Sequence, residues 1–154
     1  DSLLSQHDWT KAENDYRKVL EMNPDQPEVL LGLIKTLLAR GESAESGSIL
    51  NNFPPSNSYS SAEMLLPYLK ALTALHDGIL PDETDLDAAL KNNIRLAQRG
   101  QFLPALDGLL DILRQDRNYQ DGWGRQTFLA LLELLGREDP NTRQYRSELA
   151  SILF

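Results

Sequence analysis

The residues best suited to chemistry are few, and their spacing favours structural roles. His7 and His76 are the two histidines of the chain, and neither has a second potential metal ligand at a suitable spacing. The acidic run 82–87 lacks the glycine and the distal glutamate of an EF-hand calcium loop. A helix that begins in this run explains the carboxylates better, because the positive end of a helix dipole stabilises acidic residues. We therefore predict no metal site and no cofactor.

The sequence also lacks the motifs of catalytic nucleophiles and of phosphate-binding sites. The chain has no cysteine, which excludes a disulfide, a thiolate nucleophile and a cysteine metal site, and which fits a reducing compartment. It has no phosphate-binding loop and no Gly-x-Ser-x-Gly motif. Arg117, Asp121 and Arg125 recur at four-residue spacing, and a cap at Asp121 with local ion pairs is preferred over a partner contact. The sequence predicts that the chain is not an enzyme and binds no small-molecule substrate.

The composition indicates which elements must position these residues. Among the 154 residues are 30 Leu and 12 Ala but only six Ile and two Val, so helix formers greatly outnumber strand formers. The net charge is −8 with no cluster of Lys or Arg, which argues against nucleic acid and anionic membranes as partners. The longest apolar stretch, 128–135, is much shorter than a membrane span. The sequence predicts an all-α fold.

Apolar residues at helical spacing, with glycine or proline at the ends, predict individual helices. They are expected at 28–40, 61–77, 85–99, 102–115, 121–135 and 140–153, with a loop at 51–60. Pro67 either kinks the helix 61–77 or lies in its first turn. Asp139 is expected to cap the last helix.

Some of these helices follow a repeat. Counted from His7, small or apolar residues and a proline stand at offsets of 2, 5, 9, 12 and 17, namely Trp9, Ala12, Tyr16, Val19 and Pro24. These offsets resemble the tetratricopeptide repeat, a helix-turn-helix unit of 34 residues. A degraded copy starts at Gly41 and a better one at Gly100. Ser46 replaces the small packing alanine in the degraded copy, which puts close helix packing there in doubt.

The predicted architecture is a tetratricopeptide-like array of helical hairpins, a right-handed superhelix closed by a C-terminal capping helix. Residues 1–154 are expected to form one domain, with two repeats in 1–58, an irregular helical connector in 59–84 and a further repeat region in 85–154. Residues 1–6 correspond to about half of a first repeat helix. We therefore interpret the chain as a piece of a longer protein.

The region 85–154 resembles a narrower family. It reads ALDGLLDILRQDRNYQD at 105–121, LALLELLG at 129–136 and LASILF at 149–154, with Asp139-Pro140 between the last two. This succession resembles the C-terminal tetratricopeptide region of bacterial YbbN-type proteins, also called CnoX or chaperedoxins. The resemblance implies a cytoplasmic, holdase-type chaperone that binds unfolding clients and cooperates with the chaperonin. It also implies an upstream thioredoxin-fold domain, in which the family's redox role would reside because this chain lacks cysteine.

The repeat phase predicts a partner-binding groove lined by the first helix of each repeat. Its candidate residues are mainly apolar: Leu31, Lys35, Leu38, Leu90, Ile94 and Ala97. Such a lining suits a hydrophobic segment of a protein partner better than an acidic chain terminus. The open alternative is that the helix at 61–77, or the final helix, fills this groove within the same chain.

The final helix carries a second candidate surface, the apolar stripe Tyr145, Leu149, Ile152 and Phe154. The stripe either seals the end of the stack or docks onto the chaperonin. The predicted function is a protein-interaction module, the client- or chaperonin-binding arm of a thioredoxin-like co-chaperone. The alternative is a generic tetratricopeptide scaffold for a dedicated partner in envelope or secretion assembly.

Overall fold

A computed structural model describes residues 6–154, with side chains from Asp8 onward. The described part is helical throughout and contains no strand, as the composition predicts. Its elements are α1 (Gln6–Met22), α2 (Pro27–Ala39), α3 (Ser43–Asn51), α4 (Tyr59–Met64), α5 (Leu66–Asp77), α6 (Asp85–Gln98), α7 (Phe102–Gln115), the short 3-10 helix η1 (Tyr119–Gly122), α8 (Trp123–Leu135) and α9 (Pro140–Leu153).

The hairpins α2–α3 and α6–α7 are joined by the same turn. Gly41 and Gly100 have φ of +76° and +83°, a left-handed conformation that glycine adopts without a steric penalty. In each turn the amide that follows the glycine donates to a carbonyl five residues back, over 2.8 and 2.9 Å. The two glycines are also the starting points of the second and third repeat copies, so the predicted repeat phase agrees with the structure here.

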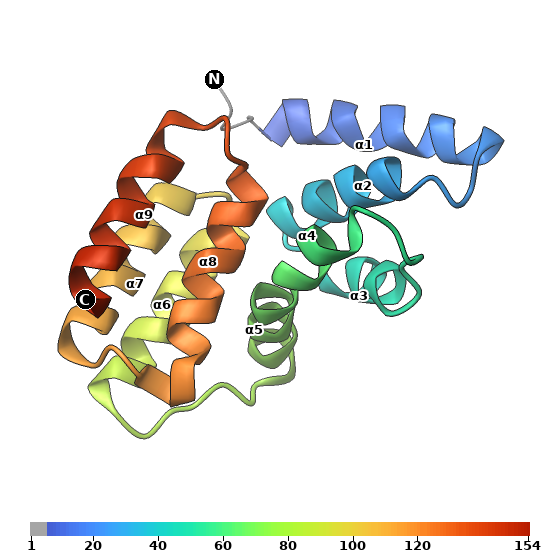
Figure 1. The fold of residues 1–154 in the computed structure, drawn as a ribbon. Helices are drawn as coiled ribbons and strands as arrows, with labels where there is room; N and C mark the ends of the chain where they lie inside the picture. The colour runs from blue at the N-terminus through green and yellow to red at the C-terminus, as the bar shows by residue number, and fades with distance from the viewer. Residues whose placement is uncertain (1–5) are drawn as a thin grey trace.

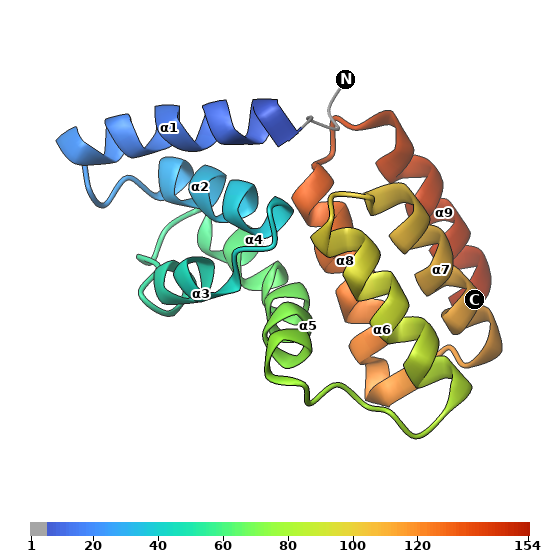
Figure 2. The same cartoon turned by 180° about the vertical axis from the view of Figure 1, so that it is seen from behind.

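The helices form two groups with α4 and α5 between them (Figures 1 and 2). Helices α1, α2 and α3 stack at one side, and α6, α7, α8 and α9 stack at the other. Helix α5 runs beside α8, and both α4 and α8 also contact α2. This irregular insertion, expected as a connector at 59–84, determines which helix faces remain accessible.

The small residues of the repeat pattern are buried where helices approach closely. Ala105 in α7 and Ser46 in α3 are both completely buried. The Ser46 hydroxyl donates to the Glu42 carbonyl over 2.7 Å, which satisfies the polar group without a partner from another helix. Close packing is therefore retained at Ser46, contrary to the doubt raised by the sequence.

Helix boundaries agree with the sequence except at the start of α1 and around α4, α5 and α8. The expected helix 61–77 is divided at Leu65, and Pro67 lies in the first turn of α5. Asp139 caps α9 as predicted, because its carboxylate accepts from the Asn141 amide over 2.8 Å. The predicted half-helix at residues 1–6 lies outside the described residues except at Gln6. Helix α1 begins there and continues through residue 7, where the repeat pattern predicts the turn between two helices.

Asp121 does not cap α8, which corrects the prediction. The residue that precedes the helix is Gly122, and no side chain caps the helix there. Asp121 instead belongs to η1 and has a φ of +55°. No ion pair of Asp121 or Arg125 was found in the described part of the chain. Arg117 donates to the carbonyl of Leu153 over 3.4 Å.

Candidate partner-binding groove

Most of the groove residues expected from the repeat phase are in the core. Leu38, Leu90, Ile94 and Ala97 have exposed fractions between 0 and 1%. Side chains this deeply buried cannot line an open groove for a partner. The expectation that they do so is corrected by the structure.

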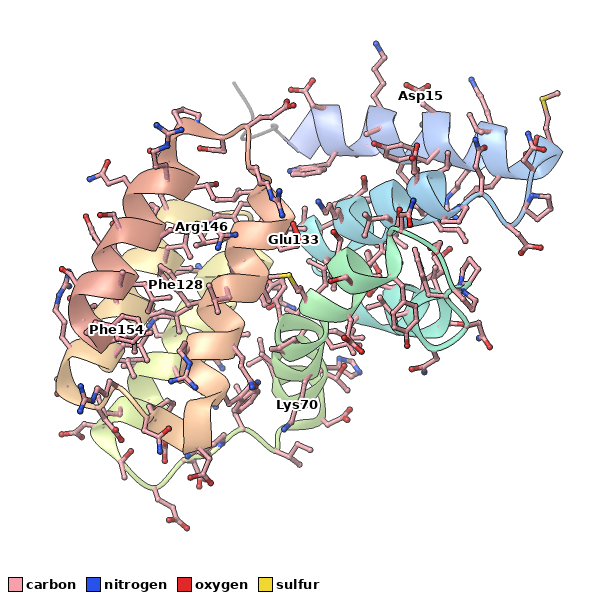
Figure 3. The ribbon with its side chains drawn as sticks, in the orientation of Figure 1. Asp15, Lys70, Phe128, Glu133, Arg146 and Phe154 are labelled. Carbon is pink, nitrogen blue, oxygen red and sulfur yellow. The ribbon has the colours of Figure 1, made fainter. Side chains whose placement is uncertain are left out.

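The other two predicted residues, Leu31 and Lys35, are half-buried on α2. The Lys35 ammonium lies 3.9 Å from a carboxylate oxygen of Glu133, which projects from the far end of α8 (Figure 3). Helices α4 and α8 both pack on α2, and α5 packs on α6. The chain therefore fills the predicted groove with its own helices, as the open alternative allowed, with α8 taking part besides the segment 61–77.

The same insertion creates a different groove, between α5 and α8. A cleft of about 930 Å³ runs along α5 and continues into a smaller hollow of about 320 Å³, with which it shares Leu66, Pro67 and Gln126. We call this surface the α5–α8 groove. Its lining residues are Glu63, Met64, Leu66, Pro67, Leu69, Lys70, Thr73, Ala74, Ile79, Pro81, Gln120, Asp121, Trp123, Gln126 and Leu129.

Large apolar side chains are exposed along this groove. The exposed fractions are 37% for Met64, 40% for Leu66 and 71% for Ile79. Scattered exposed apolar residues are ordinary on a protein surface, but several of them along one cleft are typical of an interaction site. The α5–α8 groove is therefore the candidate site of this chain.

Trp123 forms the floor in the middle of the groove. Its indole Nε1–H donates to the Pro67 carbonyl over 3.2 Å, which fixes the ring between the first turns of α5 and α8. The Lys70 ammonium lies 5.0 Å from the centroid of the ring, at the distance of a cation–π contact (Figure 3). The middle of the groove is thus held in place before any partner binds.

One end of the groove is formed by a strained segment. Gln120 and Asp121 have φ of +52° and +55°, a left-handed conformation that is unfavourable in free energy for any residue except glycine. Asp87, near the start of α6, binds this segment through hydrogen bonds. Its carboxylate accepts from the Tyr119 hydroxyl over 2.5 Å and from the Gln120 side-chain amide over 3.4 Å. Asp87 therefore connects α6 to the end of the groove.

Asp87 also completes the cap of α6. Its carboxylate accepts from the backbone amides of Glu83 and Thr84, and its own amide donates to the Thr84 hydroxyl, so that the two residues form a capping box. The Tyr119 hydrogen bond lowers the pKa of Asp87; burial opposes this change, and the two backbone amides add to it. Asp87 is therefore a buried carboxylate whose charged form is favoured by fixed donors.

The residues predicted on the final helix mostly face the protein. Leu149 is buried, Ile152 is half-buried, and the Tyr145 ring packs edge-on against Phe128 of α8. The Tyr145 hydroxyl also donates to Asp107 of α7 over 2.8 Å. Phe154 alone among the four is fully exposed. Helix α9 thus covers α7 and α8, which is what a capping helix does.

Residues 6–154 contain neither a cluster of metal ligands nor a membrane-spanning helix. No group of three or more His, Asp or Glu side chains there is arranged to hold a metal ion. His76 is exposed near the end of α5, and the His7 side chain lies outside the described residues. Of the described helices, none is long and apolar enough to cross a membrane.

Comparison with known families agrees with the repeat pattern. One tetratricopeptide repeat family matches residues 68–154, and a second matches residues 3–65. The chain belongs to the tetratricopeptide repeat family. Such domains are generally interaction modules without catalytic activity, so the family supports protein partners for this chain. It does not distinguish a YbbN-type protein from other members.

A relative from Haemophilus influenzae, described as an uncharacterized protein, is 37% identical over 68 residues. The match covers 44% of this chain, which spans only 31% of that relative. No solved structure matches the chain.

Sequence reasoning missed the α5–α8 groove. The repeat phase assumes that neighbouring hairpins stack directly, whereas α2 contacts α4 and α8 besides α6, and α5 packs on both α3 and α6. A signal was nevertheless present, since Met64 lies off the apolar stripe of the helix expected at 61–77 and Ile79 lies just after that helix, whereas Leu66 belongs to the expected stripe.

Proposed function

We propose that this chain is a protein-interaction module that binds apolar segments of unfolding proteins in the α5–α8 groove. Membership in the tetratricopeptide repeat family supports a protein partner. The observation that carries the proposal is the exposure of Met64, Leu66 and Ile79 along one groove whose middle is fixed by Trp123. An apolar cleft with few charges suits many sequences, as a holdase requires.

The finer proposal is that the chain is the client-binding arm of a YbbN-type co-chaperone with an upstream thioredoxin-fold domain. Its support is the sequence resemblance across 85–154 together with the accessible apolar groove.

Chaperonin docking is proposed at the end of α9, where Phe154 is exposed. Phe154→Ala should then reduce chaperonin co-purification without changing the thermal unfolding midpoint. Unchanged co-purification would exclude Phe154 from that contact.

An aggregation-suppression assay tests the client-binding role. Thermally unfolding citrate synthase is the client, and light scattering is measured against the concentration of the chain. The double variant Leu66→Ser/Ile79→Ser removes two exposed apolar contacts, and we expect it to need about tenfold more protein for half-suppression. Neither side chain is buried, so the variant should fold normally.

The matched control is Val19→Ser/Met22→Ser on α1. Val19 is 40% exposed, like Leu66, and Met22 is 83% exposed, close to Ile79. Both lie outside the groove lining, so the control should suppress aggregation as well as the wild type does. An equal loss in both variants would contradict the assignment of the site. No suppression by the wild-type chain at excess would overturn the client-binding role and favour the dedicated scaffold.

A further inference from the structure

Both ends of the α5–α8 groove carry carboxylates, but the end at the turn after α5 carries more of them than the opposite end, where Glu63 is the one acidic residue of the described lining. Between Lys70 and Lys91 the chain has no Lys or Arg, whereas Asp77, Asp82, Glu83 and Asp85 are exposed around the turn after α5. Ile79 and Pro81 of that turn line the groove, and Asp121 lines the same end. None of these carboxylates forms an ion pair with another described residue. Lys91 lines a small hollow together with Asp82, so five carboxylates stand against one nearby lysine, and this end presents net negative charge beside an apolar floor.

The middle of the groove, by contrast, disfavours a basic residue of a partner. Lys70 is the one cation among its described lining residues, and its ammonium lies over the Trp123 ring. A positive residue of a partner placed there would be repelled by Lys70 and would face an apolar floor. The groove thus favours a partner that is apolar over its middle and basic where it meets the turn after α5.

The backbone of the partner must satisfy its own hydrogen bonds. An extended peptide gains affinity chiefly by adding to a sheet edge, and residues 6–154 provide no strand. Most side chains of the groove lining are apolar. A helix satisfies its backbone internally, and α5 with 12 residues offers a track of about 18 Å, or three helical turns.

We infer that the α5–α8 groove takes an amphipathic helix with an apolar stripe over two to three turns and Lys or Arg at one end, which lies over Asp121 and the turn after α5. This inference rests on the proposed function, because it specifies the kind of segment that the same groove selects. Attraction between the basic end and the carboxylates orients the helix in the groove and raises its association rate. The apolar contact itself tolerates many sequences.

Fluorescence anisotropy with three labelled helical peptides tests the inference on the full 154-residue chain. The first carries leucines at positions i, i+3, i+4 and i+7 with three lysines at one end, the second has glutamates in place of the lysines, and the third has the leucines scrambled. We expect the lysine peptide to bind about tenfold more tightly than the glutamate peptide, with a difference that shrinks as salt rises. The scrambled peptide should bind weakly.

Two variants with the same net charge separate a local effect from a global one. Asp82→Asn/Asp121→Asn neutralises the acidic end, and asparagine tolerates the left-handed conformation at position 121. Asp15→Asn/Glu21→Gln neutralises two residues on α1, whose Asp15 lies on the face away from α2 (Figure 3). The lysine peptide should lose affinity about threefold to tenfold in the first variant and keep it in the second.

The inference would be overturned if both variants lost affinity for the lysine peptide equally. It would also be overturned if the wild type bound the lysine and glutamate peptides equally well. Failure of all peptides to bind would also overturn it. The proposed function is judged separately by the Leu66→Ser/Ile79→Ser variant. Suppose that variant impairs aggregation suppression while the lysine peptide binds the wild type and Asp82→Asn/Asp121→Asn equally well. In that case the groove binds clients without selecting a basic helix.

Discussion

At the scale of single residues, Asp87 makes the most contacts that matter for the groove. It caps α6 and at the same time holds Tyr119 and Gln120, which precede α8. Its exposed fraction is 3%, so the hydrogen bonds of its carboxylate cannot be replaced easily by water. A single carboxylate thus supports both a helix start and a strained turn.

Replacing Asp87 tests this role through its pH dependence. Asp87→Asn leaves the backbone amides of Glu83 and Thr84 with a poorer acceptor, and we expect it to lower the free energy of unfolding by about 1–3 kcal/mol at neutral pH. The pKa of Asp87 is lowered in the folded chain, so its stabilisation is present above the unfolded-state value of about 4 and is lost as pH falls through the folded value.

The measurement is the difference in unfolding free energy between the wild type and Asp87→Asn, taken at several pH values. The difference should be largest near neutral pH and should shrink in acid. A difference that is constant from neutral to strongly acidic pH would contradict the charged hydrogen-bond network.

Residue types alone could not locate the partner site. Leu38 and Ile94 are apolar residues at positions that suit either a groove or a core, and the transfer of their side chains from water is favourable in both cases. Which one applies depends on α4, α5 and α8, whose placement is a tertiary property.

At the scale of elements, α6 and α7 pack closely because Gly108 of α7 has no side chain. A Cβ at this position would lie 2.0 Å from the Oδ1 atom of Asn93, a buried residue of α6. Gly47 of α3 is different, since a Cβ there would find its nearest neighbour at 3.7 Å, an ordinary contact with Leu69.

Alanine at the two glycines should therefore have opposite effects. We expect Gly108→Ala to destabilise the chain by about 1–3 kcal/mol through overpacking. Gly47→Ala should stabilise it by about 0.5–1 kcal/mol, because alanine has the higher helix propensity. Chemical denaturation of both variants checks the pair, and a stabilised Gly108→Ala variant would show that α6 and α7 are not in close contact.

Most element boundaries could be predicted because they have local signals. Gly41 and Gly100 mark turns and Asp139-Pro140 marks a helix start, each through backbone chemistry that is independent of the rest of the fold. The start of α8 could not be predicted in this way. Gln120 and Asp121 adopt left-handed conformations under tertiary constraint from Asp87, and their residue types carry little sign of it.

At the scale of the whole molecule, α9 closes one end of the helical stack. Leu149 has an exposed fraction of 5% and packs in the core, whereas Phe154 is fully exposed. Leu149→Ala should lower the free energy of unfolding by about 2–5 kcal/mol because it leaves a cavity. Phe154→Ala should change it little. Similar effects of the two substitutions on the unfolding free energy would contradict a capping role for this helix.

The groove itself is also a property of the whole molecule. The insertion of α4 and α5 buries the faces that a regular array would expose, and it forms a new cleft against α8. Membership in the tetratricopeptide repeat family therefore indicates a protein partner without indicating which face binds it. We propose that the partner binds in the new cleft.

Site-directed cross-linking to an unfolding client tests that placement most directly. The chain has no cysteine, so Leu66→Cys and Val19→Cys each provide a single attachment point for a benzophenone maleimide at a side chain of the same exposure. With thermally unfolding citrate synthase as the client, we predict strong cross-linking from position 66 and only background from position 19. Equal cross-linking from both positions, or cross-linking from position 19 alone, would contradict the α5–α8 groove as the binding site.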